Sequence, residues 1–279
     1  MKWSLLSLLL LLFACHENTP RVGGKVLILF DDWNTANWIQ FEDSFQKYGI
    51  KATFFVSHYN SFDSSAKAQL SSLQATGHEI GFHGDQHRFI KGYENQSEFM
   101  TTFLKHEIDE GVLGMRKAGF NPQSYAFPGD YSTPSYRDSL LQRFAVVRKG
   151  SYGFFEYWER SRNYRLLAHE PDSFMCYDIS QSSNFQEDQN MLMMIEDVAM
   201  GKNIALLLHS FDDSSSVYSS SSVDFFNMIR RMHHYGARFE TVSDFYFPKT
   251  LDGIRISAQN APPPAPSGKR PIRYKTDPR

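Results

Sequence analysis

The sequence predicts an α/β fold in which about seven parallel strands form a barrel with helices outside it. Short apolar runs alternate with segments of helical periodicity from Lys25 to about Phe247, which is typical of repeated β-α-β units. The chain has 279 residues, 41% of them hydrophobic, enough to bury one large core. Seven or so such units fit one barrel better than two smaller domains.

The expected strands are apolar runs that end at polar residues or turns. They are 25–30, 51–56, 78–82, 124–127, 144–147, 203–208 and a segment near Phe239. The expected helices carry apolar residues three or four positions apart, and several stop before a glycine. They are 38–48, a segment around Leu70 and Leu73, about 96–117, 135–142, 191–200 and 223–235. The Met-rich helix 191–200 is expected to fill core rather than to bind metal.

One internal segment and the C-terminal tail give no such pattern. Residues 148–186 show no clear period, and their aromatic stretch 152–158 is expected either to shape a groove or to be core. Residues 251–279 are Pro-rich and then basic, which predicts a disordered tail. The folded domain is therefore expected over residues 25–250.

The N-terminus predicts export. Lys2 precedes a short apolar segment, Leu5–Phe13, which is shorter than the roughly 20 residues needed to span a bilayer. The segment ends in Leu12-Phe13-Ala14-Cys15, which resembles the lipobox of bacterial lipoproteins. The resemblance implies a signal peptide over residues 1–14, a tether over 15–24, and a lipid on Cys15 that anchors the exported protein to the membrane of the cell envelope. The alternative is an ordinary secretory signal with a chance cysteine.

Charge and cysteine content limit the partners. The net charge is −2, so nucleic acid is not expected as the main partner. Cys176 is the only other cysteine, so no internal disulfide is expected. A buried packing role suits it better than a nucleophilic one. A monomer is expected.

Residues that can bind a metal or transfer protons follow several of the expected strands. Asp31-Asp32 ends the first, His83 and His87 follow the third, Pro128-Gly129 follows the fourth, and His209 follows the strand 203–208. In a parallel barrel, the C-terminal ends of the strands open onto one face. One carboxylate and two imidazoles meeting there would form a catalytic divalent-metal site with positions left open for water and substrate.

These motifs resemble those of the polysaccharide deacetylases of the NodB-homology type, carbohydrate esterases that remove N- or O-acetyl groups from sugar polymers. The resemblance covers about Lys25 to Phe247 and rests on "LFDDWN", "GHEIGFHGDQH" and "ALLLHS". The second motif is the most specific of the three. The family fold is a distorted (β/α) barrel of about seven strands, which agrees with the alternation of elements.

The resemblance implies a metal-dependent hydrolase with assigned roles. Asp31 would be the general base and His209 the general acid. A divalent cation would be bound by Asp32, His83 and His87, with zinc expected first and cobalt, nickel or manganese as alternatives. The backbone N–H of Gly129 would donate to the oxyanion, and the substrate would be bound by Phe127, Pro128 and Leu207.

Three departures from the family pattern keep other readings open. Ala126 stands where many members have an arginine that orients the base, Gly84 stands where a Ser or Thr supports the metal loop, and no Asp-Trp motif is evident, although Tyr177-Asp178 lies in roughly that region. The main hypothesis is a deacetylase acting on an acetylated polysaccharide, such as peptidoglycan, poly-N-acetylglucosamine, chitin-like oligomers or acetylated xylan. The alternatives are a catalytically impaired, glycan-binding lipoprotein on the same fold and, more weakly, a structural zinc site.

Overall fold

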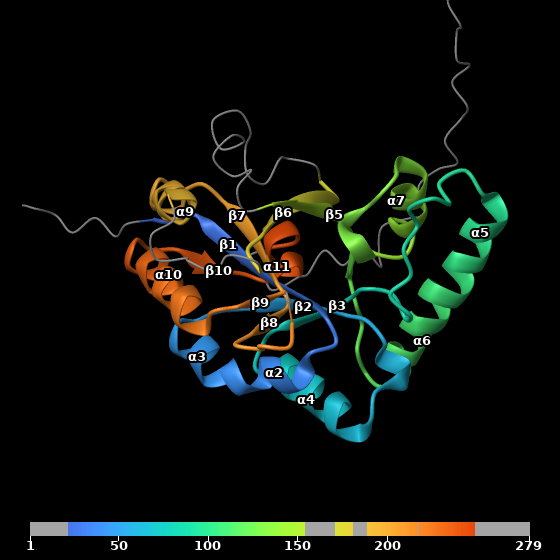
Figure 1. Ribbon diagram of the computed structural model, residues 1–279, viewed down its shortest axis with the longest axis horizontal. Helices are drawn as coiled ribbons and strands as arrows, with labels where there is room; N and C mark the ends of the chain where they lie inside the picture. Colours follow the sequence, from blue (N-terminus) through green and yellow to red (C-terminus); the bar gives the residue numbers. More distant parts are fainter. Residues whose placement is uncertain (1–21, 154–170, 181–188, 217, 249–279) are drawn as a thin grey trace, which may run out of the picture.

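The barrel is closed by pairing between its first and seventh strands. The computed structural model describes residues 22–153, 171–180, 189–216 and 218–248 (Figure 1). All strands of the main sheet are parallel, in the order β10-β1-β2-β3-β4-β5-β6-β7, and β1 also pairs with β7. The strands are β1 (Lys25–Asp32), β2 (Ala52–Val56), β3 (Glu79–Phe82), β4 (Ser124–Ala126), β5 (Val146–Gly153), β6 (Ser173–Asp178), β7 (Ile204–Leu208) and β10 (Arg238–Phe239). The predicted barrel of about seven parallel strands is therefore confirmed.

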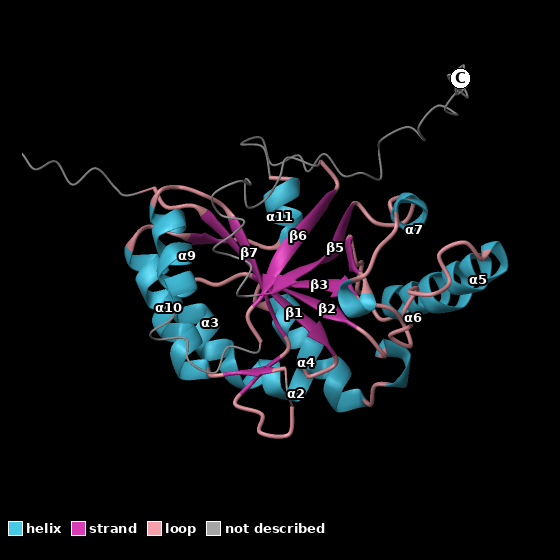
Figure 2. Ribbon diagram, turned by 45° about the horizontal axis from the view of Figure 1, so that its top comes forward, coloured by secondary structure: helices cyan, strands magenta, loops and turns pink. Residues whose placement is uncertain are grey.

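Helices cover the outside of the barrel, as Figure 2 shows. They are α2 (Thr35–Trp38), α3 (Glu42–Lys47), α4 (Ser64–Ala75), α5 (Ser97–Thr102), α6 (Glu110–Lys117), α7 (Pro134–Leu140), α9 (Gln189–Ala199) and α10 (Ser222–His234), while α11 (Val242–Tyr246) lies at one end of the barrel. A π-helical segment, η3 (Phe103–Asp109), joins α5 to α6, and a single-turn 3₁₀ helix, η4 (Pro128–Asp130), follows β4. A two-stranded pair, β8 (Ser210–Phe211) and β9 (Ser219–Ser220), follows β7.

Alternation along each strand separates two apolar layers. Successive strand residues point to opposite faces, so every second residue of a barrel strand faces the interior. The smaller cluster of buried residues fills that interior: Leu27, Leu29, Phe55, Ala126, Val146, Phe174, Cys176, Ala205, Leu207 and Val242. The larger cluster, which includes Val26, Ile28 and Phe30, packs between strands and helices. The parity of each strand therefore decides which residue at its end faces the barrel axis.

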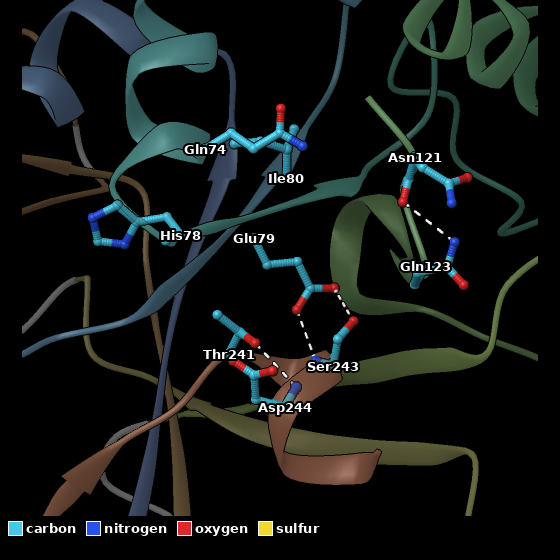
Figure 3. Close-up of a pocket in the computed structure, with 10 residues that line it drawn as sticks. Gln74, His78, Glu79, Ile80, Asn121, Gln123, Thr241, Ser243 and Asp244 are labelled. Atoms are coloured by element: carbon cyan, nitrogen blue, oxygen red, sulfur yellow. Dashed lines mark hydrogen bonds between the residues drawn. The ribbon is translucent and has the colours of Figure 1, made fainter. Parts of the chain in front are cut away.

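The N-terminal end of the barrel is closed by α11. The carboxylate of Glu79, the first residue of β3, accepts hydrogen bonds from the backbone N–H and the hydroxyl of Ser243, both 2.8 Å, and from the hydroxyl of Ser124 at 2.6 Å. Figure 3 shows Glu79 beside Ser243 in a polar hollow of about 320 Å³. Because its donors come from β4 and α11, Glu79 ties the closing helix to the strands. The open end of the barrel is therefore the opposite one, where the C-terminal ends of the strands lie.

Two elements differ from the sequence prediction. β6 lies within the region where no element was predicted, and β5 runs past the predicted strand 144–147 as far as Gly153. Along β6, the interior-facing residues Phe174 and Cys176 alternate with residues that face outward. The strand was not predicted because the residues around it, 148–186, show no helical periodicity that would mark its ends. The predicted helix 96–117 is present, with η3 in its middle.

The structure bears directly on predictions for the Met-rich helix, Cys176 and the end of the tether. Met191 and Met194 are buried in the core, as predicted for the Met-rich helix. Cys176 is fully buried, and burial raises the pKa of its thiol well above the ordinary value, which confirms a packing role. Gly23 and Gly24, the last residues of the predicted tether, are bonded through their backbone N–H groups to Gly236 and Val198.

Other predictions fall outside the described residues. The signal peptide, Cys15, residues 154–158 of the aromatic stretch and the tail 251–279 lie there. Within the described part of the chain, no helix is both long and apolar enough to cross a membrane.

Candidate metal and catalytic site

The strand ends bring the predicted site residues to the open end of the barrel. Asp31 continues the interior-facing series of Leu27 and Leu29, and His209 continues that of Ala205 and Leu207. His83 follows β3 with the same inward parity. Apolar interior residues thus form the floor, and the next inward position after β1, β3 and β7 carries a carboxylate or an imidazole.

Asp32, His83 and His87 form a group that can bind a metal ion. One ligand atom from each lies within 4.8 Å of the other two. The Nε2 atom of His87 is 3.3 Å from Asp32 Oδ1, and that of His83 is 3.7 Å from the same oxygen. One carboxylate and two imidazoles are a donor set that suits a divalent ion such as zinc, with coordination positions left for other ligands.

Two of these ligands, Asp32 and His87, have a strained backbone that directs their side chains toward the site. Asp32 has φ 83° and His87 has φ 55°, both in the left-handed region that non-glycine residues rarely adopt. Strict strand alternation would turn Asp32 away from the side chain of Asp31. The left-handed backbone instead lets these neighbouring carboxylates serve the same site, and such strain is characteristic of functional sites.

A buried carboxylate from η3 supports the metal loop. The side chain of Glu107 accepts hydrogen bonds from the backbone N–H of Gln86, at 3.0 and 3.1 Å to its two oxygens, and from that of Arg88 at 2.9 Å. A Cβ atom on Gly84 would lie 2.4 Å from Glu107 Oε1, and Gly84 has φ 87°. Gly84 therefore makes room for Glu107, whose carboxylate holds the backbone of this loop. Burial raises the pKa of Glu107, and the two backbone donors oppose that shift.

The surroundings of the buried His83 and the half-buried Asp32 favour the protonation states that a metal ion requires. His83 Nδ1 lies 2.9 Å from the carbonyl oxygen of Ala126 and donates to it, which leaves Nε2 free to bind. Burial is the main cause that lowers the pKa of His83, although Asp31 opposes it, and the lowered pKa favours the neutral imidazole. Burial alone would raise the pKa of Asp32, but the hydrogen bond from His87 and the electrostatic interactions with the neighbouring histidines bring it below its usual value.

Arg148 is the partner of the predicted base, Asp31. From β5, its two terminal nitrogens donate to the two oxygens of Asp31 at 2.9 and 2.5 Å, and one also donates to Asp130 at 3.0 Å. Arg148 is 0% exposed and Asp31 2%. Burial opposes the charge on Arg148, but the carboxylates of Asp31 and Asp130 raise the pKa of the guanidinium. Ala126, the position of the family arginine, is the Cα partner of Arg148 in the β4–β5 register. The guanidinium therefore reaches the site from the neighbouring strand.

His209, the predicted acid, is also held from two sides. Its Nδ1 atom is 2.8 Å from the hydroxyl of Ser180, and its carbonyl oxygen accepts from the indole N–H of Trp38 at 2.7 Å. Asp178 in turn accepts from the backbone N–H of Ser180 at 2.8 Å. With Nδ1 engaged, the free Nε2 of His209 is the atom that can exchange a proton with a substrate.

The remaining predicted residues lie in and beside η4. Gly129 has φ 67°, and a Cβ there would lie 2.4 Å from the ring of Phe89. Pro128 is buried at the start of η4. Phe127 packs in the outer core and Leu207 in the barrel interior, each 1% exposed. Their roles in oxyanion and substrate binding stay predictions.

Arg148, Glu107 and Ser180 are the site residues that sequence reasoning missed. Arg148 comes from the strand next to the one that carries Ala126, Glu107 lies 21 positions from Gln86, and Ser180 lies 29 positions from His209, so no motif at the expected positions reveals them. One signal was available for Arg148. It follows the apolar run "FAVV" directly, as Asp31 and His209 follow theirs, and the strand-end argument applied to those residues would have placed it at the same face.

Comparison with known proteins agrees with this geometry. Residues 19–135 match the family model of the polysaccharide deacetylases. The matched segment contains Asp31, Asp32, His83 and His87. No curated protein shows significant sequence similarity to the chain.

Solved structures show that the whole barrel has the fold of this deacetylase family, the family 4 carbohydrate esterases. A family 4 acetyl xylan esterase from Clostridium thermocellum, in complex with a cobalt ion, has a TM-score of 0.54 at 20% identity, over 80% of this chain and 90% of that one. The peptidoglycan deacetylase PdaC from Bacillus subtilis, in a mutant form, has a TM-score of 0.51 at 19% identity, over 80% and 89%. A family 4 pseudoenzyme with restored activity has a TM-score of 0.53 at 13% identity, over 81% and 68%.

Proposed function

We propose that the protein is a metal-dependent hydrolase that removes acetyl groups, N-acetyl groups in the first instance, from a polysaccharide of the cell envelope or the extracellular space. The observation that carries this proposal is the buried pair of Arg148 and Asp31 beside the ligand group of Asp32, His83 and His87. A protein that only binds a metal has no need of a second, arginine-bound carboxylate next to the ligands.

The metal group fits this role by its donor chemistry. Asp32, His83 and His87 would hold the ion, with zinc proposed first and cobalt, nickel or manganese as alternatives. The ion supplies Lewis acidity, which lowers the pKa of water and polarises the acetyl carbonyl.

The chain's own residues would carry the proton transfers. Asp31, oriented by Arg148, accepts a proton from the attacking water, and His209 donates one through Nε2 to the leaving amine or alcohol. The backbone N–H of Gly129 donates to the oxyanion. The hydroxyl of Ser180 holds the imidazole of His209 in one orientation, and the indole of Trp38 fixes the backbone of the same residue, so less conformational entropy is lost when the imidazole reaches its reactive position.

A catalytically impaired glycan-binding protein is the alternative. It is favoured by the three departures at Ala126, Gly84 and the fourth motif, and a pseudoenzyme with this fold is known among the similar structures. Against it, each departure is accompanied by a contact that can replace the missing one: Arg148 on Asp31, Glu107 on the metal loop, and Ser180 on His209.

Acetate release from a panel of acetylated glycans, with and without a chelator, tests the proposal. Peptidoglycan, N-acetylglucosamine oligomers and acetylated xylan cover the candidate substrates. Asp31→Asn should abolish release while the metal content stays the same, whereas His83→Ala should lose the metal. Full activity in Asp31→Asn would remove Asp31 as the base, and no acetate from any glycan with metal bound would favour the non-catalytic alternative.

The proposed location is the cell envelope, through a lipid on Cys15. The lipobox-like sequence Leu12-Phe13-Ala14-Cys15 supports it. Cys15→Ala should move the protein from the membrane fraction to the soluble one, and unchanged membrane association would contradict lipidation at this residue.

A further inference from the structure

Exposed aromatic rings border the metal group on more than one side. Among the described residues, Trp33, Phe89 and Tyr218 are 48%, 53% and 45% exposed. Scattered exposed aromatic residues need no explanation, but each of these three lies against an imidazole of the site. We call these three residues the aromatic rim.

Trp33 is held in place by two histidines. Its ring centroid is 6.2 Å from that of His87 and 4.9 Å from that of His58, and both contacts are edge-to-face, at 83° and 77°. A ring wedged in this way has few other orientations, so a ligand that stacks on its exposed face would lose little conformational entropy on binding.

Phe89 lies on the other side of His87. The two ring centroids are 5.2 Å apart at 82°. The Phe89 ring also lies so close to Gly129 that a side chain at that glycine would collide with it. Phe89 is thus in contact with a metal ligand and with the backbone proposed to donate to the oxyanion, which places it beside the reacting group.

Tyr218 covers the acid. Its ring lies 5.0 Å from the imidazole of His209 and is tilted by only 33° to it. The rim therefore has Trp33 and Phe89 beside His87, and Tyr218 beside His209. Phe30 and Leu208 are Cα partners in the parallel β1–β7 register, so the residues that follow them, Asp31 and His209, lie at the same end of neighbouring strands, next to the ligand Asp32.

The chemistry of these rings selects a class of ligand. A pyranose ring has an apolar C–H face and a polar hydroxyl edge. Its apolar face can therefore stack on an exposed aromatic ring, and no ionic contact is needed. We propose that the aromatic rim binds pyranose units next to the acetylated one, so that the site prefers oligomers over acetylated monosaccharides. This inference rests on the proposed function, because it places the reacting acetyl group at the metal group.

Binding measurements separate this inference from the reaction. The probes are N-acetylchitotetraose, acetylated xylotetraose and N-acetylglucosamine, titrated by calorimetry into the zinc-loaded Asp31→Asn protein so that they are not consumed. At least one tetramer should bind about tenfold or more tightly than the monosaccharide. Trp33→Ala and Phe89→Ala should each weaken binding of that tetramer roughly tenfold, and Trp33→Ala should leave binding of the monosaccharide unchanged.

The controls address folding and site integrity. Trp33→Tyr should retain most of the tetramer affinity, since it keeps an aromatic face. Phe247→Ala removes an aromatic residue that is 37% exposed and follows α11 at the closed end of the barrel, and it should change nothing. Zinc binding by every variant should match that of the parent.

Two results would overturn the proposal that the aromatic rim binds neighbouring pyranose units. One is equal affinity of the parent for tetramers and monosaccharide, or no binding of either tetramer. The other is unchanged tetramer binding in Trp33→Ala and Phe89→Ala. Acetate release by the protein with Asp31 intact is measured separately: tetramer binding without any release would refute the proposed function and keep the rim.

Discussion

Removing Arg148 should both destabilise the barrel and disable the proposed base. In Arg148→Ala, Asp31, whose side chain is 3% exposed beside Arg148, would lose two hydrogen bonds, and an uncompensated buried charge costs about 3–5 kcal/mol. Loss of the hydrogen bond between Arg148 and Asp130 adds less to this free-energy cost, because the Asp130 carboxylate is 28% exposed. At about 2–4 °C per kcal/mol for a domain of this size, the loss corresponds to a fall in Tm of roughly 6–20 °C. A carboxylate released from its clamp should also lower kcat about a hundredfold.

The assays are thermal unfolding and acetate release, with two comparison variants. Arg143→Ala removes a surface arginine that binds Asp109, and it should cost less than about 1 kcal/mol. Arg148→Ala combined with Ala126→Arg returns the guanidinium to the neighbouring strand, at the position the family uses, and should restore part of both properties. Wild-type Tm and kcat in Arg148→Ala would refute the reasoning, because they would mean that Asp31 needs no cationic partner.

Three further predictions concern the supports of the site. Glu107→Gln should weaken zinc binding about 10- to 100-fold in calorimetry, because the metal loop loses a charged acceptor; an unchanged Kd would show that Glu107 does not position the loop. Ser180→Ala should lower kcat roughly tenfold with KM unchanged, since His209 loses its Nδ1 partner; a change in KM alone would contradict this. The metal-free protein should lose stability as the pH falls below about 6.5, because burial lowers the pKa of His83 and of His78, so the unfolded chain takes up protons that the folded chain does not. Chemical denaturation at pH 7.5 and 5.5 measures this, and a free energy of unfolding that stays flat or rises on acidification would contradict it.

Local patterns determined most of the fold. Apolar runs ending at Asp31, His83 and His209 marked strands that the structure contains, and their number was enough to predict a closed parallel barrel. β6 was not predicted because the residues that flank it in the sequence show no helical periodicity that would mark where the strand begins and ends. The helix 96–117 was predicted as a unit, but nothing in its period signalled η3, the turn that carries Glu107.

The sequence by itself determined which strand ends carry chemistry, since period-two alternation and the His-x₃-His spacing are properties of neighbouring residues. Only the tertiary structure decided what supports them. Arg148 lies 117 positions from Asp31, Ser180 lies 29 from His209, and Glu107 lies 21 from Gln86. Contacts over such separations depend on strand register and barrel closure rather than on local propensity. The contacts that hold Asp31, His209 and the metal loop therefore could not be read from any motif in the sequence.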